Sequence, residues 1–441
     1  MQKDGRQAQQ SAAKPTPLSE IGEMLNAPLT RRQALAKGSA LAAAAALPAW
    51  FLSACGSDTT ASSGGATGTS GAKPIKIGFI PLTDCSPVVM AGLLGYYKQR
   101  GLNVQVIKQA SWPATRDALI SGDIDAAHGL FGMPFSVATG IGGKAGTKKL
   151  KVAMTLNDNG QGITLKKEYA AGGYGDLEKT KAALNGGQGK TFAMTFPGGT
   201  HDAWLRYWLL AMGIDMKTPK IIPIPPPQMV ANMTAGNMDG YCVGEPWNAV
   251  AVQNGIGFTS IATQDIWTNH PEKALIVNAD FAAQRRDDLK QVMGAMFDAC
   301  KWLDDVANVP ETAKKIGTPA YVNAKPDAIA GRMAGKYELG AGLGTKTFGD
   351  DRMRFFDDGK VNFPRKAYAT WFLAQYQRFG YLSAAPSYKA LANDLILSDL
   401  YKEVADAEGV KVPSDDMAPF TVKLDGVTFD PNDPAAEVAR K

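Results

Sequence analysis

The sequence is poor in the side chains from which most metal centres and enzyme active sites are built. Only three histidines and four cysteines occur among its 441 residues. His-x-x-x-His pairs, Cys-x-x-Cys, the P-loop glycine pattern and Gly-x-Ser-x-Gly are all absent. Apart from Cys55, the cysteines are Cys85, Cys242 and Cys300, which cannot all pair with one another, so no disulfide framework is indicated. We therefore expect no metal site and no cofactor.

The chain also lacks a concentrated basic surface of the kind that binds nucleic acid. Its formal net charge is +5, from 47 Lys and Arg against 42 Asp and Glu. Residues 1–54 hold six of the basic and three of the acidic residues, so the rest carries an excess of only two basic charges. No basic stripe stands out there, which argues against a nucleic-acid partner.

Long apolar runs are missing except near the N-terminus, where the sequence has the features of an export signal. Arg31 and Arg32 precede an Ala-rich apolar run from Gly38 to Ala54, which is too short for a stable transmembrane helix. The twin arginines resemble the Tat signal of proteins that are exported folded. Leu52-Ser53-Ala54-Cys55 resembles a bacterial lipobox, after which cleavage would leave Cys55 lipidated. A buried Ala-rich helix is the alternative interpretation.

The export signal is followed by a stretch that cannot build a core. Residues 55–74 are rich in Ser, Thr and Gly, a composition typical of a flexible tether. We therefore predict a signal peptide over 1–54 and a tether over 55–74, ahead of a globular body. This order of parts is that of a lipid-anchored periplasmic protein.

From residue 75 onward, strand and helix patterns alternate, which indicates an α/β fold with parallel sheets. The first series of predicted elements is a strand at 75–82, a helix at 87–100, a strand at 104–107, a helix at 113–120 and a strand at 124–127. The second series is a strand at 191–195, a helix at 200–212, a strand at 220–224, a helix at 228–235 and a strand at 241–243.

A short match between the two series suggests two lobes of one topology. Gly122-Asp123-Ile124-Asp125-Ala126 resembles Gly236-Asn237-Met238-Asp239-Gly240, and in both a helix ends at glycine and a strand begins close to the aspartate. Two such lobes would face each other across a central cleft at the carboxyl ends of their strands, where α/β folds bind ligands. The chain after Pro271 is mostly helical and is expected to complete the first lobe. The predicted lobes are thus 75–165 with 272–441, and 166–271.

Pro197-Gly198-Gly199-Thr200-His201-Asp202 is the most informative local feature. It lies between a predicted strand and a predicted helix. Glycines let the backbone approach a ligand, and the start of a helix offers free N–H groups and a partial positive charge. The segment therefore outlines an anion site, with a plain glycine turn as the alternative.

Other polar residues at strand ends could face the same cleft. Trp112 can donate one hydrogen bond from its indole, or it packs in the core. Gln161 offers an amide N–H, or it belongs to an ordinary turn. Lys273 begins a buried strand and needs an anionic partner, which is either a bound anion or a neighbouring carboxylate. His128 is either a ligand contact or a structural residue.

Taken together, these segments resemble the nitrate- and bicarbonate-binding lipoproteins of ATP-driven (ABC) uptake systems, from about Lys73 to about Phe429. The segments that carry the resemblance are 78–87, 110–112 with 116–117, 125–128, 196–201, 244–248, 263–267 and 270–273. The resemblance implies a type II, two-lobed periplasmic-binding-protein fold that closes over a small anion. It also implies delivery of that anion to an ABC permease and its ATPase, a monomer anchored through lipid on Cys55, and no enzymatic activity.

The resemblance further implies the ligand contacts. They are Trp112, Gln161, His201 and Lys273, with Gly198, Gly199 and Thr200 as backbone or hydroxyl donors. Nitrate oxygens only accept hydrogen bonds and suit a site made of donors and positive charge. Bicarbonate also needs an acceptor for its O–H, and its binders in this family resemble one another in having Glu where this chain has Lys273. Neighbours on a strand point to opposite faces, so Glu272 is expected outside the pocket.

We therefore favour nitrate as the ligand, with nitrite as a second one. A bicarbonate-binding protein of the same family is the nearest alternative, and an anion sensor is another. An enzyme is the alternative from a different class, because relatives of this fold make thiamin pyrimidine and Cys85 could suggest a nucleophile. No base-and-orienter set is visible around Cys85, however.

Overall fold

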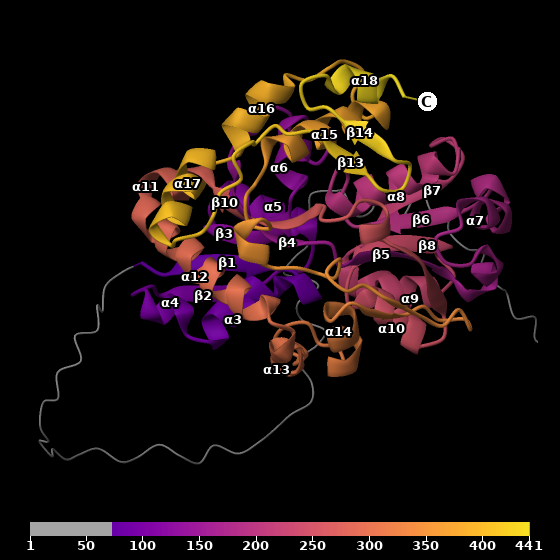
Figure 1. Ribbon diagram of the computed structural model, residues 1–441, viewed down its shortest axis with the longest axis horizontal. Coiled ribbons are helices and arrows are strands. Elements are labelled where there is room, and N and C mark those ends of the chain that lie inside the picture. The colour runs from indigo at the N-terminus through magenta and orange to yellow at the C-terminus, as the bar shows by residue number, and fades with distance from the viewer. Residues whose placement is uncertain (1–72, 441) are drawn as a thin grey trace, which may run out of the picture. The chain divides into compact units, whose positions relative to one another are not determined.

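The computed structural model describes residues 73–440, so the predicted signal peptide, Cys55 and nearly all of the predicted tether lie outside the described residues. The described chain is built on two five-stranded sheets, with two further two-stranded ribbons. Figure 1 shows the first sheet among indigo, purple and orange elements and the second among magenta ones. No helix within residues 73–440 combines the length and apolar character needed to cross a membrane.

The first sheet joins strands that are far apart in the sequence. Its order is β2 (Val104–Lys108), β1 (Ile75–Phe79), β3 (Ala126–Leu130), β10 (Pro271–Asn278) and β4 (Leu150–Asp158). β1 is parallel to β2 and β3, whereas β10 is antiparallel to β3 and β4.

The second sheet repeats this arrangement. Its order is β7 (Lys220–Pro223), β6 (Thr191–Met194), β8 (Gly240–Gly244), β5 (Gln161–Lys166) and β9 (Gly257–Ala262). β6 is parallel to β7 and β8, and β5 is antiparallel to β8 and β9. The α/β class is confirmed, but each sheet is mixed rather than wholly parallel. The reason is that β10 and β5, each the first strand after the chain crosses between sheets, insert antiparallel to their neighbours.

The match between 122–126 and 236–240 reflects one contact made twice. Asp125 Oδ2 accepts a hydrogen bond of 2.8 Å from the backbone N–H of Lys76 at the start of β1. Asp239 Oδ2 accepts one of 2.8 Å from the backbone N–H of Thr191 at the start of β6. Asp125 therefore ties the start of β1 to the chain that enters β3, and Asp239 ties the start of β6 to the chain that enters β8.

The helices cover both sheets, and the helices predicted at 113–120, 200–212 and 228–235 are each found within one residue of those bounds. The helices between residues 86 and 284 are α3 (Ser86–Leu93), α4 (Tyr96–Gln99), α5 (Trp112–Ser121), α6 (Met133–Ala138), α7 (Leu177–Ala183), α8 (Thr200–Ala211), α9 (Met229–Thr234), α10 (Trp247–Gln253) and α11 (Ala279–Gln284). The later helices are α12 (Arg286–Asp304), α13 (Val309–Ile316), α14 (Pro326–Met333), α15 (Lys366–Arg378), α16 (Tyr388–Leu395), α17 (Ser398–Ala407) and α18 (Pro434–Val438). The single helix expected over 87–100 is two helices, because Gly95 between them has a left-handed conformation with φ 81°.

The C-terminal region serves both sheets. α12 and α17 share an apolar cluster with β1 and β10 of the first sheet. The ribbon β11 (Lys336–Glu338) and β12 (Thr345–Thr347) instead lies on the second lobe, because Leu339 O accepts a 2.8 Å hydrogen bond from the backbone N–H of Thr259 in β9. The ribbon β13 (Phe420–Val422) and β14 (Val427–Phe429) also reaches that side, where Phe420 stacks on Trp267 at 4.2 Å.

These contacts differ from the lobe boundaries expected from the sequence. The first crossing between the sheets falls between Asp158 and Gln161, several residues before the expected boundary at 165/166, so β5 belongs to the second sheet. Residues 272–441 likewise do not all complete the first lobe. Apolar side chains of the late segments bury themselves against β9 and the loop after it, which a reading of helix periodicity does not reveal.

Candidate functional site

The predicted ligand-binding side chains converge at the seam between the two sheets. Trp112 is the first residue of α5, Gln161 the first of β5, and Lys273 lies near the start of β10. Thr200 and His201 open α8. All five are completely buried, as are Asp84, His128 and Glu272, which join them.

Lys273 is the cation at the centre of this cluster. Its ammonium donates to Asp84 Oδ2 and to Glu272 Oε1, both at 2.8 Å. Burial opposes the charged lysine, but the two carboxylates outweigh that effect and raise the pKa of Lys273 above its ordinary value. The lysine is therefore charged. The anionic partner expected for it from the sequence is, in this structure, the pair of carboxylates of Asp84 and Glu272.

Glu272 was expected to point away from Lys273, and that expectation is wrong. The pairing of β10 with β4 shifts register on both sides of Lys273. Such a bulge breaks the alternation of side chains along a strand, so consecutive residues can face the same side. Glu272 Oε1 also accepts from the Thr200 hydroxyl, and Oε2 accepts from Trp204 Nε1 at 2.8 Å. Glu272 thus belongs to the site and links the first sheet to α8.

Asp84 is the second acidic residue of the site, and it lies within segment 78–87, which carries part of the family resemblance. It lies in the 3-10 turn η1 (Thr83–Cys85) that follows β1. Besides Lys273, it accepts from Gln161 Nε2 at 2.9 Å and from His128 Nε2 at 2.8 Å. Burial by itself would raise its pKa, but Lys273 and the His128 hydrogen bond lower it below the ordinary value. The sequence does indicate that Asp84 closely follows β1. Because β1 lies beside β2, the strand that precedes Trp112, this position at two neighbouring strand ends is the signal that could identify Asp84 as a site residue.

A chain of hydrogen bonds fixes the orientation of Gln161. Gln161 Oε1 accepts from His201 Nε2 at 3.0 Å, while His201 Nδ1 accepts from the Thr195 hydroxyl at 2.6 Å. With both ring nitrogens used in this way His201 is neutral, and burial, followed by the charge of Lys273, lowers its pKa well below the ordinary value. The amide N–H of Gln161 therefore points toward Asp84 and Lys273, as a donor to the same space.

Trp112 supplies a donor with no partner in the described chain. Its indole Nε1 is buried and makes no hydrogen bond. The ring lies 5.7 Å from the His128 ring and 5.9 Å from the Lys273 ammonium, measured to ring centroids. A buried N–H without an acceptor is costly, so its presence beside a buried cation points to a ligand that accepts hydrogen bonds.

The glycine turn has a different role from the one expected. The backbone N–H of Gly198 donates to Asp202 Oδ2 at 2.8 Å and that of Gly199 to Phe196 O at 2.9 Å, so both are used within the turn. A Cβ on Gly199 would lie 2.6 Å from Leu130 Cδ1 of β3. Gly199 thus permits close approach of the lobes. The hydroxyl of Thr200, at the start of α8, donates to Glu272.

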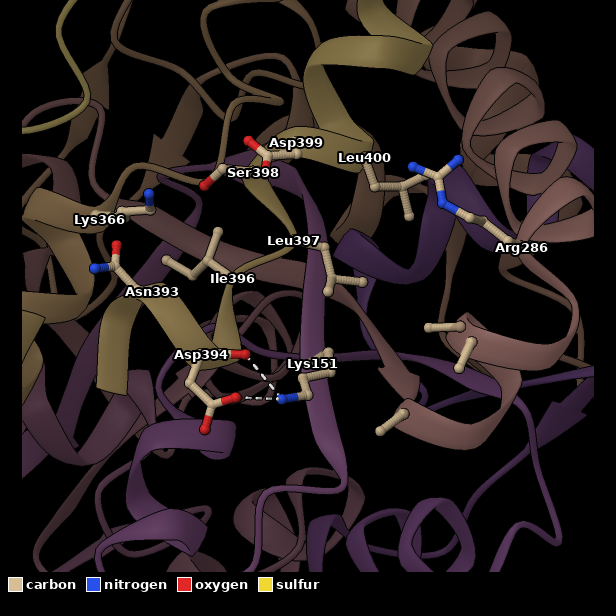
Figure 2. Close-up of a pocket in the computed structure, with 13 residues that line it drawn as sticks. Lys151, Arg286, Lys366, Asn393, Asp394, Ile396, Leu397, Ser398, Asp399 and Leu400 are labelled. Carbon is tan, nitrogen blue, oxygen red and sulfur yellow. Dashed lines mark hydrogen bonds and ion pairs between the residues drawn. The ribbon is translucent and has the colours of Figure 1, made fainter. Parts of the chain in front are cut away.

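Several cavities lined by described residues lie away from this cluster. A cavity of about 550 Å³ lies where α11, α12, α16 and α17 meet β4 (Figure 2). Its main polar contact joins Lys151 to Asp394 at 2.9 Å, and none of the predicted ligand-binding residues lines it. Within residues 73–440, no group of three or more His, Cys, Asp or Glu side chains is arranged to hold a metal ion.

Two similar lobes with a buried polar seam define a solute-binding protein of the periplasmic type. The NMT1-like family matches residues 68–317. The chain is 39% identical over 433 residues to the nitrate/nitrite binding protein NrtA of Synechococcus elongatus, which covers 92% of this chain and 96% of that one. It is 29% identical over 386 residues to the bicarbonate-binding protein CmpA of the same organism, with 82% and 85% covered.

Solved structures agree with these relationships. The crystal structure of the periplasmic nitrate-binding protein NrtA from Synechocystis PCC 6803 superposes with a TM-score of 0.78 at 36% identity, over 83% of this chain and 97% of that one. The chain therefore belongs to the NMT1-like family, and the two-lobed periplasmic-binding-protein fold implied by the sequence resemblance is confirmed.

Proposed function

We propose that this protein is the periplasmic solute-binding component of an ABC import system and that its ligand is nitrate. The observation that carries the proposal is the burial of the Lys273 ammonium in the seam between the lobes, beside the indole N–H of Trp112, which has no partner among residues 73–440. Gln161, Thr200 and His201 reach the same seam from the second lobe. A small anion with acceptor oxygens is the ligand that such donors recognise.

Sequence relationship supports nitrate over bicarbonate. The identity is higher to the nitrate/nitrite-binding relative than to the bicarbonate-binding one, and it extends over more of the chain. Nitrite is a second candidate ligand, because it too offers only acceptors. Closure of the lobes around the anion would give the shape that a permease and its ATPase recognise.

One observation favours bicarbonate as the alternative. Glu272 and Asp84 place carboxylate oxygens beside Lys273, and these could accept the O–H that nitrate lacks. Each of those oxygens already accepts from a donor of the protein, however. We therefore retain nitrate as the first choice.

A thiol enzyme is disfavoured by the surroundings of Cys85. Its side chain is fully buried in an apolar cluster with Phe79, Val89 and Met90. Burial, followed by the nearby charge of Asp84, raises the pKa of the thiol above its ordinary value. Cys85 is thus held as a neutral, inaccessible thiol, the reverse of an activated nucleophile.

We also propose that the protein is exported by the Tat route and held at the membrane by lipid on Cys55. The support is the order of twin arginines, apolar run and Leu52-Ser53-Ala54-Cys55 in the sequence. A monomer is proposed as well. Replacement of Cys55 by Ala should release the protein from membranes in a cell fractionation, and retention there would contradict the anchor.

Equilibrium dialysis tests the ligand directly. The purified protein is dialysed against nitrate, nitrite or bicarbonate, and the ions retained are measured by ion chromatography. We expect one nitrate per chain and displacement by nitrite but not by bicarbonate. Retention of bicarbonate in place of nitrate would reverse the choice.

A further inference from the structure

The cluster around Lys273 holds more acidic than basic groups. Asp84 and Glu272 each lie 2.8 Å from the ammonium, and all three side chains are fully buried. The neighbouring histidines do not add positive charge, because burial lowers the pKa of His128, of His201 and of His270, the last to about 3. With both carboxylates ionised, the cluster carries one net negative charge before any anion arrives.

The groups that face Glu272 come from every element packed against it. Lys273 follows it on β10 and Asp84 shares the Lys273 ammonium. From α8, Thr200 and Trp204 donate to it, and His201 Nε2 lies 3.4 Å from Oε1. His270 Nδ1 lies 3.8 Å from Oε2, and the neutral thiol of Cys242 on β8 is also near Glu272. Lys273 is the only charged cation of this set.

Adding an anion to this cluster increases its existing excess of negative charge. An anion that takes hydrogen bonds from Lys273 competes with Glu272 and Asp84 for the same N–H groups and brings a further negative charge into a desolvated space. Uncompensated buried charge is strongly unfavourable, and ionisable groups respond by changing protonation. A proton taken up with the anion restores the charge that the cluster had before binding.

We propose that Glu272 takes up this proton, so that each nitrate is captured together with one proton from solution. The inference rests on the proposed function and adds a determinant of affinity to the same site. The new O–H bond forms on a carboxylate oxygen of Glu272, and no other covalent bond changes. Once protonated, the carboxyl group of Glu272 donates a hydrogen bond that nitrate accepts. The ionised carboxylate has no proton to donate and repels the anion.

The alternatives to Glu272 are less suited to hold the proton. Burial would raise the pKa of Asp84, but its contacts with Lys273 and His128 outweigh this and keep that pKa low. A second proton on His201 would place another cation near Lys273, and burial together with that lysine's charge lowers the pKa of His201 well below its ordinary value. A proton on His128 Nδ1 would find no acceptor, because that atom is buried without a partner in the described chain. Burial raises the pKa of Glu272, although Lys273 opposes this, so Glu272 is the carboxylate of the pair that takes up a proton more readily.

Calorimetry on the intact protein tests the proposal. Nitrate is titrated into the protein at pH 6, 7 and 8 in buffers with different heats of ionisation, so that protons exchanged on binding appear as buffer-dependent heat. We expect uptake approaching one proton per nitrate. The nitrate affinity should therefore weaken as the pH rises, by up to about tenfold per pH unit. In Glu272→Gln the uptake should vanish and the affinity should no longer depend on pH. Glu437→Gln, a buried glutamate paired with Arg378 and Arg440, is the matched control and should behave as the wild type.

The outcomes separate the two levels of the argument. Heat from nitrate without proton exchange in the wild type overturns the coupling but leaves nitrate binding in place. Proton uptake that survives in Glu272→Gln but disappears in Asp84→Asn also overturns it, because the proton then resides on Asp84. Absence of heat and of retained nitrate at every pH overturns the proposed function itself. The buffer-dependent heat is measured on the wild type and needs no variant. The proposal can therefore be contradicted even if a variant fails to fold.

Discussion

The ammonium of Lys273 lies 2.8 Å from Asp84 Oδ2, and neither side chain is exposed to solvent. The two residues are 189 positions apart in the chain, at the end of β1 and near the start of β10. Their pairing places one charged lysine at the seam where the two lobes meet. The following predictions depend on that placement.

Replacement of Lys273 by Glu should abolish nitrate binding. The change removes the cation and leaves three buried carboxyl groups together, so we expect affinity to fall by at least about 100-fold, equivalent to ~3 kcal/mol. Fluorescence or calorimetric titration measures the loss. Lys151→Gln is the matched control, because Lys151 pairs with Asp394 in the cavity of Figure 2 instead of at the seam. Equal losses in both variants would contradict a specific role for Lys273.

Replacement of Trp112 by Phe should weaken binding without destabilising the protein. The indole Nε1 has no partner in the described chain, so its loss leaves no protein acceptor unsatisfied. We expect nitrate affinity to fall by roughly tenfold, which is the value of one hydrogen bond to a charged partner. The midpoint of urea unfolding without nitrate should stay near that of the wild type. An unchanged affinity would place Trp112 in the core only.

Replacement of Gly199 by Ala should hinder the approach of the lobes. The new Cβ would meet Leu130 Cδ1 at 2.6 Å, closer than packed carbon atoms allow. We expect weaker nitrate binding and less compaction on ligand addition, measured by small-angle scattering.

The matched control for Gly199→Ala is Gly349→Ala, where an added Cβ meets nothing within 4 Å. It should leave both readouts unchanged. Truncation of Leu130 to Ala in the Gly199→Ala background should restore part of the affinity, because it removes the contacting atom. Failure of that double variant to recover would mean that the turn itself is disturbed.

Asp84 should make stability depend on pH in the acid range. Burial favours the neutral carboxyl, but Lys273 and His128 outweigh it and hold the pKa of Asp84 below its unfolded value. A group whose folded pKa is depressed contributes stability above its unfolded pKa, near 4, and that contribution is lost as the pH falls further. Urea denaturation at pH 6, 5, 4 and 3 should therefore show a shallower acid loss in Asp84→Asn than in the wild type. Parallel losses would contradict this assignment.

Much of the architecture could be predicted because it depends on local sequence patterns. Alternating strands and helices gave the α/β class, and Asp125 and Asp239 marked the repeat because the same backbone contact recurs in each lobe. The direction of β5 and β10 could not be read in this way. Whether a strand inserts parallel or antiparallel depends on where the chain crosses between sheets, and no local pattern records that.

The site was predicted in part, for similar reasons. Trp112, Gln161, Thr200, His201 and Lys273 do converge, since each lies at or near the first residue of an element that begins at the seam. The side of the strand to which Glu272 points was not predictable, because a bulge breaks the alternation only after β10 is paired with β4. Asp84 was passed over because an acidic residue is not an obvious component of an anion site. Asp84 contributes to the site as the partner of Lys273, and only the folded chain brings these two residues together.

The most direct test of the account is a crystal structure of the protein with nitrate bound. We expect one nitrate at the seam, within hydrogen-bonding distance of Lys273 Nζ and Trp112 Nε1, with Gln161 as a further donor. Nitrate bound elsewhere, as in the cavity of Figure 2, with the Lys273, Asp84 and Glu272 contacts unchanged, would contradict the account.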